Sequence, residues 1–597
     1  VSGLLVRQWR FMTWQTELNS SFAWLLQAFA WIILGFFITI GLFSRTEFGR
    51  KFARIVRPSL HRGNILKFGG LLLLLIMMVL LEVRFSVLNS FFYNGLYSSM
   101  QELDADKFWF FAKLNALLVG VQVLHTIVDY FLQQLFQIRW LESLNAVLVQ
   151  RWLENKKYYR LKYERELPDN IDQRIEQDAR EFIASTVQIV RGMINAILTT
   201  IEFTIILWSL SGVLSLFGLN IEKGVVFFIY AFIIFATLMS VWIGHPLIKL
   251  NFNKEKLNGD YRYSLIRVRD NAESIAFYQG EPREGQLLQQ KFRDIIHNRW
   301  AIVLRMLGLD GFNGGVTRVA KLLPLMLQAP RFFSGQIKLG DMHQTVQAFN
   351  RLMTALSFFR LFYEEFTLYQ ARLNRLHGFL SKLDELDANA VTQPSKCAHR
   401  VALHDFGVKD EQGAILLNNI NLTLEAGDAL LIQGPSGTGK TTLLKAIAGI
   451  YPFETLGLAE HPCSGTLFLP QRPYMPQGTL RDAICYPALN PSHQELVQAM
   501  RDCCLEKYLP ALHDENDWQA ILSPGELQRV AFIRILLSRP EVVFLDETTS
   551  ALDEPTEQLL YQTIKARLPQ MIILSVGHRS TLYPFHNKRL DLAVCRL

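Results

Sequence analysis

One stretch of the chain has the residue types and spacing of a phosphate-binding loop: Gly434-Pro435-Ser436-Gly437-Thr438-Gly439-Lys440-Thr441-Thr442. It follows the apolar residues 429–432 and leads into a helical pattern, which is the context that G-x-x-x-x-G-K-[ST] requires. Its glycines let backbone N–H groups turn toward phosphate oxygens, and the helix N-terminus adds partial positive charge. We expect Lys440 to bind the terminal phosphates of a nucleoside triphosphate and Thr441 to coordinate Mg²⁺.

Two further motifs follow this loop along the chain. Gln471 ends an apolar run and is expected to reach Mg²⁺ and the attacking water. The second motif reads Leu522-Ser523-Pro524-Gly525-Glu526-Leu527-Gln528-Arg529. Here Ser523, Gly525 and Glu526 open a helix, so that a hydroxyl, backbone N–H groups and the helix dipole can bind a γ-phosphate.

The remaining motifs supply the acid and base groups of a hydrolase. Asp546 ends an apolar run and is expected to organise Mg²⁺, and Glu547 is expected to polarise the hydrolytic water. Asp553 closes the next motif, Ser550-Ala551-Leu552-Asp553, which we expect to contribute to the nucleotide site. His578 follows a further apolar strand and is placed to contact the γ-phosphate. A lone histidine is more often structural, but five motifs in this order favour the catalytic role.

In this order the motifs resemble those of the ABC transporter superfamily, and the resemblance extends over the whole chain. It implies ATP and Mg²⁺ as cofactors, with Mg²⁺ held by Thr441, Gln471 and Asp546. It also implies a homodimer, because Ser523 would bind the γ-phosphate of ATP held by the opposite subunit. The chain departs from the family near residues 408–411, where an aromatic side chain usually stacks on adenine. Lys409 and Asp410 stand there instead, and Phe406 is the nearest aromatic.

Composition indicates that much of the chain lies in a membrane. Half of the 597 residues are hydrophobic, and 19% are charged, against about 25% in ordinary globular proteins. The basic residues behind the net charge of +7 stand mainly beside apolar runs, which favours cytoplasmic flanks of membrane helices over a nucleic-acid groove. The six cysteines show no C-x-x-C spacing, so we expect reduced thiols and neither disulfides nor a zinc site.

Apolar segments divide the chain into four predicted parts. Residues 1–66 hold an interfacial segment, an extra hydrophobic helix and a basic loop; this helix either spans the membrane or lies on it. Residues 67–376 form a helical transmembrane domain, 377–400 a linker, and 401–597 an α/β P-loop ATPase domain. Six core spans are expected at 67–89, 108–136, 183–210, 224–248, 300–328 and 343–366. The long charged segments 137–182 and 249–299 predict extended cytoplasmic helices, as in the exporter-type ABC fold.

Ionisable residues fall inside these spans, where charge is expensive unless it faces the bundle interior or water. They are Glu82, Arg84, Lys113, His125, Asp129, Arg191, Glu202, Arg305, Asp310, Arg318 and Lys321. Together they favour a polar translocation cavity, with Glu202, Arg191, Asp129 and Arg84 as candidate cavity residues. The alternative is that they form ion pairs between helices or snorkel near helix ends.

The membrane half carries a narrower resemblance. Residues 271–280, Asn-Ala-Glu-Ser-Ile-Ala-Phe-Tyr-Gln-Gly, resemble the cytoplasmic-loop motif of the ABC-D group, which includes peroxisomal acyl-CoA transporters and the lysosomal cobalamin transporter. Residues 169–175 resemble the N-P-D-Q-R-I segment of bacterial relatives. The overall likeness is to bacterial YddA-type half-transporters and a mycobacterial cobalamin importer, whose membrane domain is similar to that of the SbmA/BacA peptide-uptake proteins. It implies a water-filled cavity for hydrophilic molecules and a loop helix that docks on the ATPase; a charged loop without a docking role is the alternative.

These expectations combine into a homodimeric, ATP-driven transporter surrounded by lipid in a bacterial inner membrane, with the ATPase domain in the cytoplasm and no nucleic-acid partner. It would import peptides or cobalamin by alternating access. An alternative load is fatty acids or their CoA thioesters, whose negative charge would suit Arg84, Arg191 and Arg318. A non-transporting ABC ATPase is disfavoured, because such proteins normally carry two ATPase domains and no membrane spans.

Overall fold

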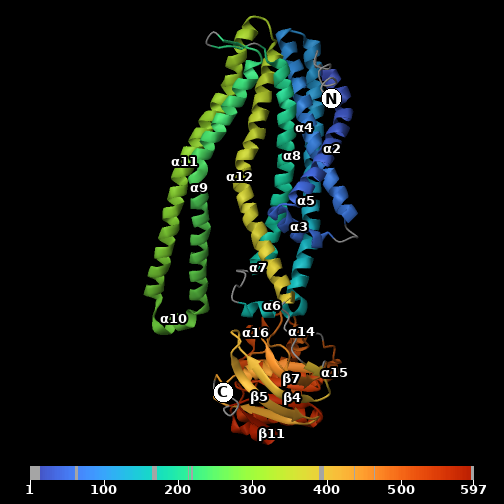
Figure 1. The fold of residues 1–597 in the computed structure, drawn as a ribbon, viewed down its shortest axis with the longest axis vertical. Coiled ribbons are helices and arrows are strands. Elements are labelled where there is room, and N and C mark those ends of the chain that lie inside the picture. The colour runs from blue at the N-terminus through green and yellow to red at the C-terminus, as the bar shows by residue number, and fades with distance from the viewer. Residues whose placement is uncertain are drawn as a thin grey trace. The chain divides into compact units, whose positions relative to one another are not determined.

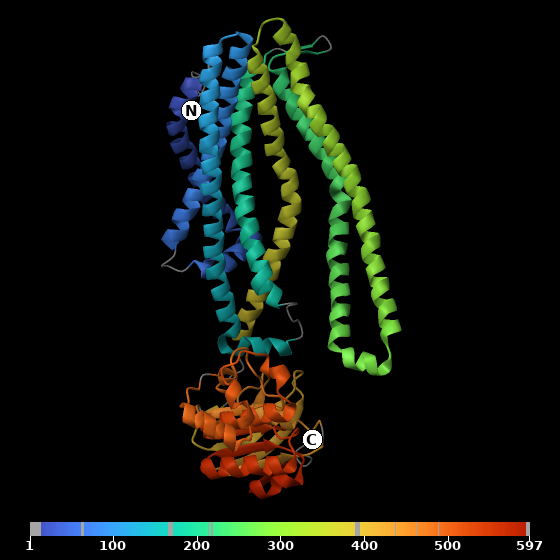
Figure 2. The same ribbon diagram turned by 180° about the vertical axis from the view of Figure 1, so that it is seen from behind.

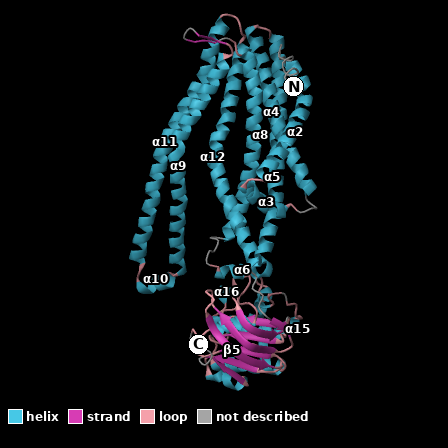
Figure 3. Cartoon of the chain, viewed as in Figure 1, coloured by secondary structure: helices cyan, strands magenta, loops and turns pink. Residues whose placement is uncertain are grey.

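The computed structural model describes residues 14–60, 65–164, 171–212, 214–216, 219–388, 395–435, 437–462, 464–487 and 489–592. The chain divides into two compact units, Val1–Glu385 and Leu386–Leu597. The first unit is made almost wholly of helices, and the second combines strands with helices (Figure 3). Residues 169 and 170, the start of one of the family-like segments, lie outside the described residues.

Long helices build the first unit. They are α2 (Trp14–Phe43), α3 (Glu47–Ser59), α4 (Ile65–Gln101), α5 (Ala105–Leu153), α8 (Ala179–Leu210), α9 (Gly224–Asp270), α10 (Ala272–Tyr278), α11 (Glu281–Phe333) and α12 (Leu339–Ala388). Short turns lie between α5 and α8, namely η1 (Glu154–Lys156), α6 (Lys157–Arg160), η2 (Leu161–Tyr163), α7 (Ile171–Gln173) and η3 (Arg174–Asp178). The strands β1 (Leu214–Leu216) and β2 (Leu219–Ile221) pair between α8 and α9.

The helices are long enough to cross a membrane and to continue beyond it. Within the described residues, five helical stretches meet the length and apolarity expected of a membrane span: Trp14–Phe43, Leu66–Gln101, Ala105–Tyr163, Ile171–Leu210 and Gly224–Asp270. The last two expected spans lie inside α11 and α12, which have 53 and 50 residues but are more polar. At 1.5 Å per residue, α11 is about 80 Å long, more than twice the hydrocarbon core of about 30 Å. The charged segments therefore extend the helices, as the sequence predicts.

The helices α9 and α11 form an arm that leaves the rest of the helical unit. Figures 1 and 2 show them side by side from opposite directions, diverging from α8 and α12, with α10 joining their ends. The helix α10 belongs to the family-like segment 271–280, and its Phe277 and Tyr278 are 78% and 86% exposed. Two large aromatic side chains are thus presented at the end of the arm.

The basic segment after α2 is a helix, which corrects the loop expected from sequence. The helix α3 begins because the Thr46 side chain accepts a hydrogen bond from the backbone N–H of Gly49. Its apolar face packs through Phe52 against Phe182 of α8, at 5.8 Å between ring centroids. Its basic face includes Arg54, which pairs with Asp384 of α12 at 2.7 Å. Amphipathic spacing and an N-cap outweigh the high positive charge that suggested a loop.

The second unit is built on two sheets. A five-stranded parallel sheet has the order β11-β6-β10-β9-β8, and a four-stranded sheet has the order β3-β7-β4-β5. Strands are β3 (Ser395–Cys397), β4 (Val401–Lys409), β5 (Ile415–Leu424), β6 (Ala429–Gln433), β7 (Thr455–His461), β8 (Thr466–Leu469), β9 (Val542–Asp546), β10 (Ile572–Val576) and β11 (Lys588–Asp591). Helices are α13 (Lys440–Ile447), α14 (Leu480–Ile484), α15 (His493–Asp502), η4 (Glu506–Ala511), α16 (Trp518–Ile521), α17 (Pro524–Ser538), α18 (Glu554–Arg567) and η5 (Ser580–Phe585).

Continuous apolar runs explain the central strands of the parallel sheet. Every residue of β9 and β10 is buried, as expected for parallel strands covered on both faces. Apolar runs in the sequence predict strands at 429–433, 466–470, 542–546 and 571–576. The first and third match β6 and β9 residue for residue, and the second and fourth match β8 and β10 within one residue at an end.

Candidate nucleotide-binding and catalytic site

The predicted catalytic residues gather at one edge of the parallel sheet. The strands β6, β10, β9 and β8 are neighbours in that order and all run in the same direction. Their carboxyl ends lead into the phosphate loop, His578, Glu547 and Gln471, respectively. Ligands of parallel α/β sheets bind outside the carboxyl ends of the strands, so the sheet brings together four motifs that are far apart in the sequence.

The phosphate loop has the conformation that its glycines predict. Gly434, Gly437 and Gly439 have φ values of +142°, +80° and +88°, a region that side chains strongly disfavour. The ammonium of Lys440 donates to the carbonyls of Gly434 and Pro435, each at 2.8 Å, and thereby lies over the loop. Thr438 donates to the same Pro435 carbonyl at 2.9 Å. Thr442 is half-buried on α13, and Ser436 lies outside the described residues.

The predicted metal ligands stand next to one another. The Thr441 hydroxyl donates to Oδ1 of Asp546 at 2.8 Å, so a hydroxyl and a carboxylate oxygen meet beside the N-terminus of α13. Burial raises the pKa of Asp546 above its ordinary value, and the Thr441 hydrogen bond and two nearby lysines only partly oppose this. A desolvated carboxylate beside a hydroxyl is an oxygen donor set that suits Mg²⁺. These residues fit the metal that the motifs imply.

Two predicted catalytic side chains, Gln471 and His578, approach the carboxylate of the third, Glu547. Gln471 donates through Nε2 to Oε2 of Glu547 at 3.0 Å, and Nε2 of His578 lies 3.7 Å from Oε1. Glu547 itself has φ +50°, which is uncommon for a residue with a side chain and costs conformational energy. Its backbone N–H donates to the Val576 carbonyl at the end of β10 at 3.2 Å. The strained turn therefore aims the Glu547 carboxylate out of the sheet edge, between Gln471 and His578.

The segment beginning at Ser523 is the N-terminus of α17. Ser523 and Glu526 form a capping box: each side chain accepts a hydrogen bond from the backbone N–H of the other. Pro524, which stands where glycine is more usual in the family, occupies the first turn, where its missing N–H costs nothing. A Cβ on Gly525 would lie 3.1 Å from the Ala551 carbonyl, so glycine allows the Ser550–Asp553 loop to approach. Asp553 is the exposed residue before α18.

The pKa of Glu526 is lowered, so the stability of the ATPase domain should depend on pH. Although burial opposes ionisation, Lys507 at 2.5 Å and the hydrogen bonds from Ser523 and Tyr508 lower the pKa of Glu526 from 4.5 to about 2. The stabilisation is therefore fully present above pH 4.5 and is lost as the pH falls toward about 2. We expect Glu526→Gln, which keeps a capping group but loses the charge, to destabilise the domain by about 1–3 kcal/mol at pH 7.

Thermal unfolding of the detergent-solubilised protein between pH 7 and pH 3 measures this effect, and the deficit of Glu526→Gln should shrink as the pH falls. The matched control is Glu495→Gln, which alters a second capping box on α15 whose glutamate is exposed. A deficit that is equal for both variants, or independent of pH, would contradict the assigned role of the Lys507 pair.

Two residues of the site were missed from sequence, namely Gln528 and Arg579. Gln528 on α17 is 3% exposed; it donates to the Gln471 carbonyl at 3.3 Å and to the Ser550 hydroxyl at 3.2 Å, and accepts from the Ala551 N–H at 3.0 Å. Arg579 donates to the carbonyls of Leu552 and Ser550 at 2.7 and 3.1 Å. The only sequence features that could have indicated them are their positions in the chain, close to Ser523 and next to His578, respectively. Both tie the Ser550–Asp553 loop to the other motifs.

We expect Gln528→Leu to lower kcat for nucleotide hydrolysis by about tenfold while nucleotide affinity changes little. The substitution removes three hydrogen bonds that position the loops around Gln471 and Ser550, and leaves the phosphate loop intact; one lost buried contact of 1–3 kcal/mol corresponds to this factor. Steady-state hydrolysis and equilibrium nucleotide binding separate the two effects. Gln498→Leu, which removes an exposed hydrogen bond to Asp502 on α15, is the control and should retain the wild-type rate.

None of the three residues near the expected adenine position is available for stacking. Phe406 is 1% exposed and belongs to the core between β4 and β5. Lys409 pairs with Glu454 at 2.8 Å, and Asp410 accepts from the backbone N–H groups of Gln412 and Ala414 within a tight turn. The described residues at this position therefore offer no aromatic stacking surface.

The four residues expected to line a substrate cavity occur instead as polar pairs between helices. Arg84 of α4 is 2% exposed and pairs with Glu17 of α2 at 2.8 Å. Trp24 of α2 donates to Glu202 of α8 at 2.7 Å. Asp129 of α5 pairs with Arg191 of α8 at 2.6 Å. Two of these contacts are interhelical ion pairs, which was the alternative reading, and the third is a hydrogen bond. Through Glu17 and Trp24, α2 contacts α4 and α8.

Comparison with known families covers both units. Residues 54–333 match the family described as ABC transporter transmembrane region 2, and residues 417–550 match the ABC transporter family. A protein of Haemophilus influenzae described as an uncharacterized ABC transporter ATP-binding protein is 78% identical over 98% of this chain and 100% of its own length.

Two more distant relatives also align over most of their length. The inner membrane ABC transporter ATP-binding protein YddA of Escherichia coli is 30% identical over 91% of this chain and 97% of its own length. The human lysosomal cobalamin transporter ABCD4 is 28% identical over 92% of this chain and 95% of its own length. The motifs, the helical unit and these relatives agree, and ATP and Mg²⁺ are the cofactors of the site. The chain is an integral membrane protein of the ABC transporter family, of the ABC-D type, in which ATP hydrolysis drives transport.

Proposed function

We propose that the protein is a homodimer that imports hydrophilic solutes, such as peptides or cobalamin, across a bacterial inner membrane by alternating access. The observation that carries the proposal is charge on the exposed surface of the membrane-spanning helices. Glu82, Arg305, Asp310, Arg318 and Arg351 are all exposed in the single chain. Charge facing lipid is expensive, so these side chains favour a watery pathway between two copies.

Two further features support the dimer. The arm of α9 and α11 has exposed apolar side chains outside the expected spans, including Phe252 and Phe292 at 71% and 49%. A second copy would cover them. Phe277 and Tyr278 on α10 would dock on an ATPase domain and convey its closure. Ser523 would complete the site at Lys440 of the other copy, as the family resemblance implies.

The names of two relatives support the proposed substrate and the proposed membrane. One is a lysosomal cobalamin transporter and the other an inner membrane protein. Acyl-CoA is the second candidate load, favoured by the exposed cations Arg305, Arg318 and Arg351, which suit an anionic nucleotide group.

Hydrolysis of ATP by the purified protein in lipid nanodiscs tests the proposal. A proline-rich peptide, cobalamin and a long-chain acyl-CoA are titrated in turn, with Glu547→Gln as the inactive blank. Stimulation by peptide or cobalamin alone supports the hydrophilic load, and uptake into vesicles of defined orientation then tests the direction. Stimulation by acyl-CoA alone would overturn the proposed substrate class.

A further inference from the structure

A small polar cavity lies among α4, α8 and α12 of the helical unit. Its volume is about 50 Å³, and it is lined by Glu82, Val83, Ser86, Asn195, Thr199, Arg351, Thr354 and Ala355. Two opposite charges, three hydroxyls and an amide contribute to this lining, against one valine and one alanine. Such a lining is unusual for a gap between membrane helices, where polar groups are costly.

The two charged residues of this cavity are unpaired. Across the parts of the chain that the structure describes, Glu82 and Arg351 make no ion pair or hydrogen bond with one another or with any other side chain. Two other arginines of these helices are paired, Arg84 with Glu17 and Arg191 with Asp129. Glu82 and Arg351 are also exposed in the chain. Both charges therefore remain available to a group that enters from outside.

The cavity lies near the middle of the expected membrane span. At the outer ends of the helices, Asn94 of α4 donates to Asp341 and Gln344 of α12 at 3.0 and 2.6 Å. Counting 1.5 Å per residue from these contacts places Glu82 about 18 Å and Arg351 about 10–15 Å along their helices. The hydrocarbon core is about 30 Å thick. Two free charges at this depth require water or a polar solute beside them.

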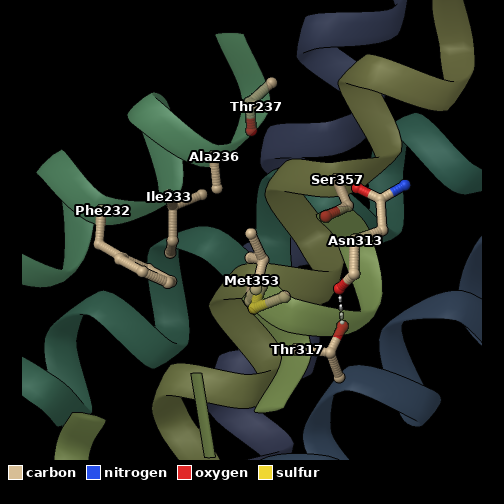
Figure 4. Close-up of a pocket in the computed structure, with 9 residues that line it drawn as sticks. Phe232, Ile233, Ala236, Thr237, Asn313, Thr317, Met353 and Ser357 are labelled. Carbon is tan, nitrogen blue, oxygen red and sulfur yellow. Dashed lines mark hydrogen bonds between the residues drawn. The ribbon is translucent and has the colours of Figure 1, made fainter. Parts of the chain in front are cut away.

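The opposite face of α12 lines a second cavity, which contains no unpaired charged residue. Figure 4 shows Met353 and Ser357 of α12 beside residues of α9 and α11, around a cavity that is also about 50 Å³. Its polar group Asn313 already accepts from Ser240 at 2.7 Å and, through its carbonyl, from Thr317 at 2.8 Å. None of the residues that line it is charged. The free binding capacity therefore lies on the Arg351 face of α12.

We propose that the cavity between Glu82 and Arg351 docks the transported solute, and that it selects a group carrying both an ammonium and a carboxylate, as a short peptide does. This inference rests on the proposed function and narrows its substrate class. Glu82 would accept hydrogen bonds from the ammonium, and Arg351 would donate to the carboxylate. The cavity of about 50 Å³ is too small to enclose a whole peptide, so Glu82 and Arg351 would hold only its two charged ends, and the chain between those ends would lie in the open pathway.

Peptides with blocked ends test this assignment on the protein in nanodiscs. We measure the concentration of trialanine, of N-acetyl-trialanine and of trialanine amide that half-maximally stimulates ATP hydrolysis. In the wild type, each blocked peptide should need about tenfold more than trialanine, because each loses one charge-assisted contact. Glu82→Gln should remove the preference for the free amine and keep the preference for the free carboxylate; Arg351→Gln should do the reverse.

These ratios are measured within one preparation, so they do not depend on how much of a variant is folded. Glu82→Asp keeps the charge and should retain the preference for the free amine. Glu142→Gln, which alters an exposed charge of α5 outside the cavity lining and outside the expected spans, is the matched control and should keep both preferences.

Two classes of result would overturn the inference and leave the proposed function standing. The first is that Glu82→Gln and Arg351→Gln both keep the wild-type ratios between blocked and free trialanine. The second is that cobalamin stimulates hydrolysis and none of the peptides does. Equal stimulation by all three peptides in the wild type would likewise exclude recognition of a zwitterion. Stimulation by a long-chain acyl-CoA alone would overturn the proposed hydrophilic load itself.

Discussion

Glu547→Gln should bind ATP as well as the wild type and hydrolyse it at least about a hundredfold more slowly. The substitution keeps the size of the side chain and the capacity to accept a hydrogen bond from Gln471, which lies 3.0 Å from Oε2. It removes the negative charge that would take a proton from the attacking water, and such a base contributes about 10²–10⁴ in rate. The phosphate loop, with its Lys440 contacts to Gly434 and Pro435, is untouched.

Single-turnover hydrolysis and binding of a fluorescent ATP analogue measure the two quantities separately. The control is Glu554→Gln, which alters an exposed carboxylate in the first turn of α18 and should leave both unchanged. Near wild-type hydrolysis by Glu547→Gln would show that another group acts as the base.

The second large effect concerns the proposed dimer. Lys440→Ala and Ser523→Arg should each abolish hydrolysis when present in every chain, the first by removing the phosphate-binding cation and the second by filling the N-terminus of α17. A mixed dimer of one chain of each kind should recover activity. If each site uses Lys440 of one copy and Ser523 of the other, one of its two sites carries both substitutions and the other carries neither.

Two affinity tags, one on each variant, allow the mixed dimer to be purified and its hydrolysis compared with that of each pure variant. An intact site acting independently would give about half of the wild-type rate, because hydrolysis then adds over the two sites. Sites built within one chain predict no recovery, since every site would then carry one substitution. A mixed dimer as inactive as the pure variants would therefore contradict the shared sites.

The parts of the fold that could be predicted are those that local sequence determines. Continuous apolar runs located β6 and β9, because strands buried on both faces leave little choice of side chain. The phosphate loop was predictable because three glycines, a lysine and a threonine must occur at fixed spacing. Its conformation, with positive φ at each glycine, is the one that this spacing predicts. The long charged segments likewise predicted helices extending beyond the membrane.

The parts that could not be predicted depend on contacts between distant segments. Gln528 lies between Gln471 and Ser550, which are 57 and 22 residues away in the sequence, and nothing local indicates this. Glu202 was expected to face a cavity, but its nearest partner is Trp24, 178 residues away. A charged residue inside an apolar run of the sequence indicates that its side chain needs a polar partner. The sequence alone does not say whether a neighbouring helix or the transported solute provides that partner.

The pairing of Arg84 with Glu17 has a consequence for how the chain enters the membrane. Arg84 is 2% exposed, and its guanidinium also contacts the hydroxyls of Ser20 and Ser21 and the ring of Trp24. All of these partners belong to α2, which leaves the ribosome before α4. An arginine in the middle of an apolar helix is costly to insert into a membrane. Here its counter-charge, Glu17, belongs to the helix that is synthesised before it. We therefore expect α2 and α4 to insert together as a hairpin in which Glu17 neutralises Arg84.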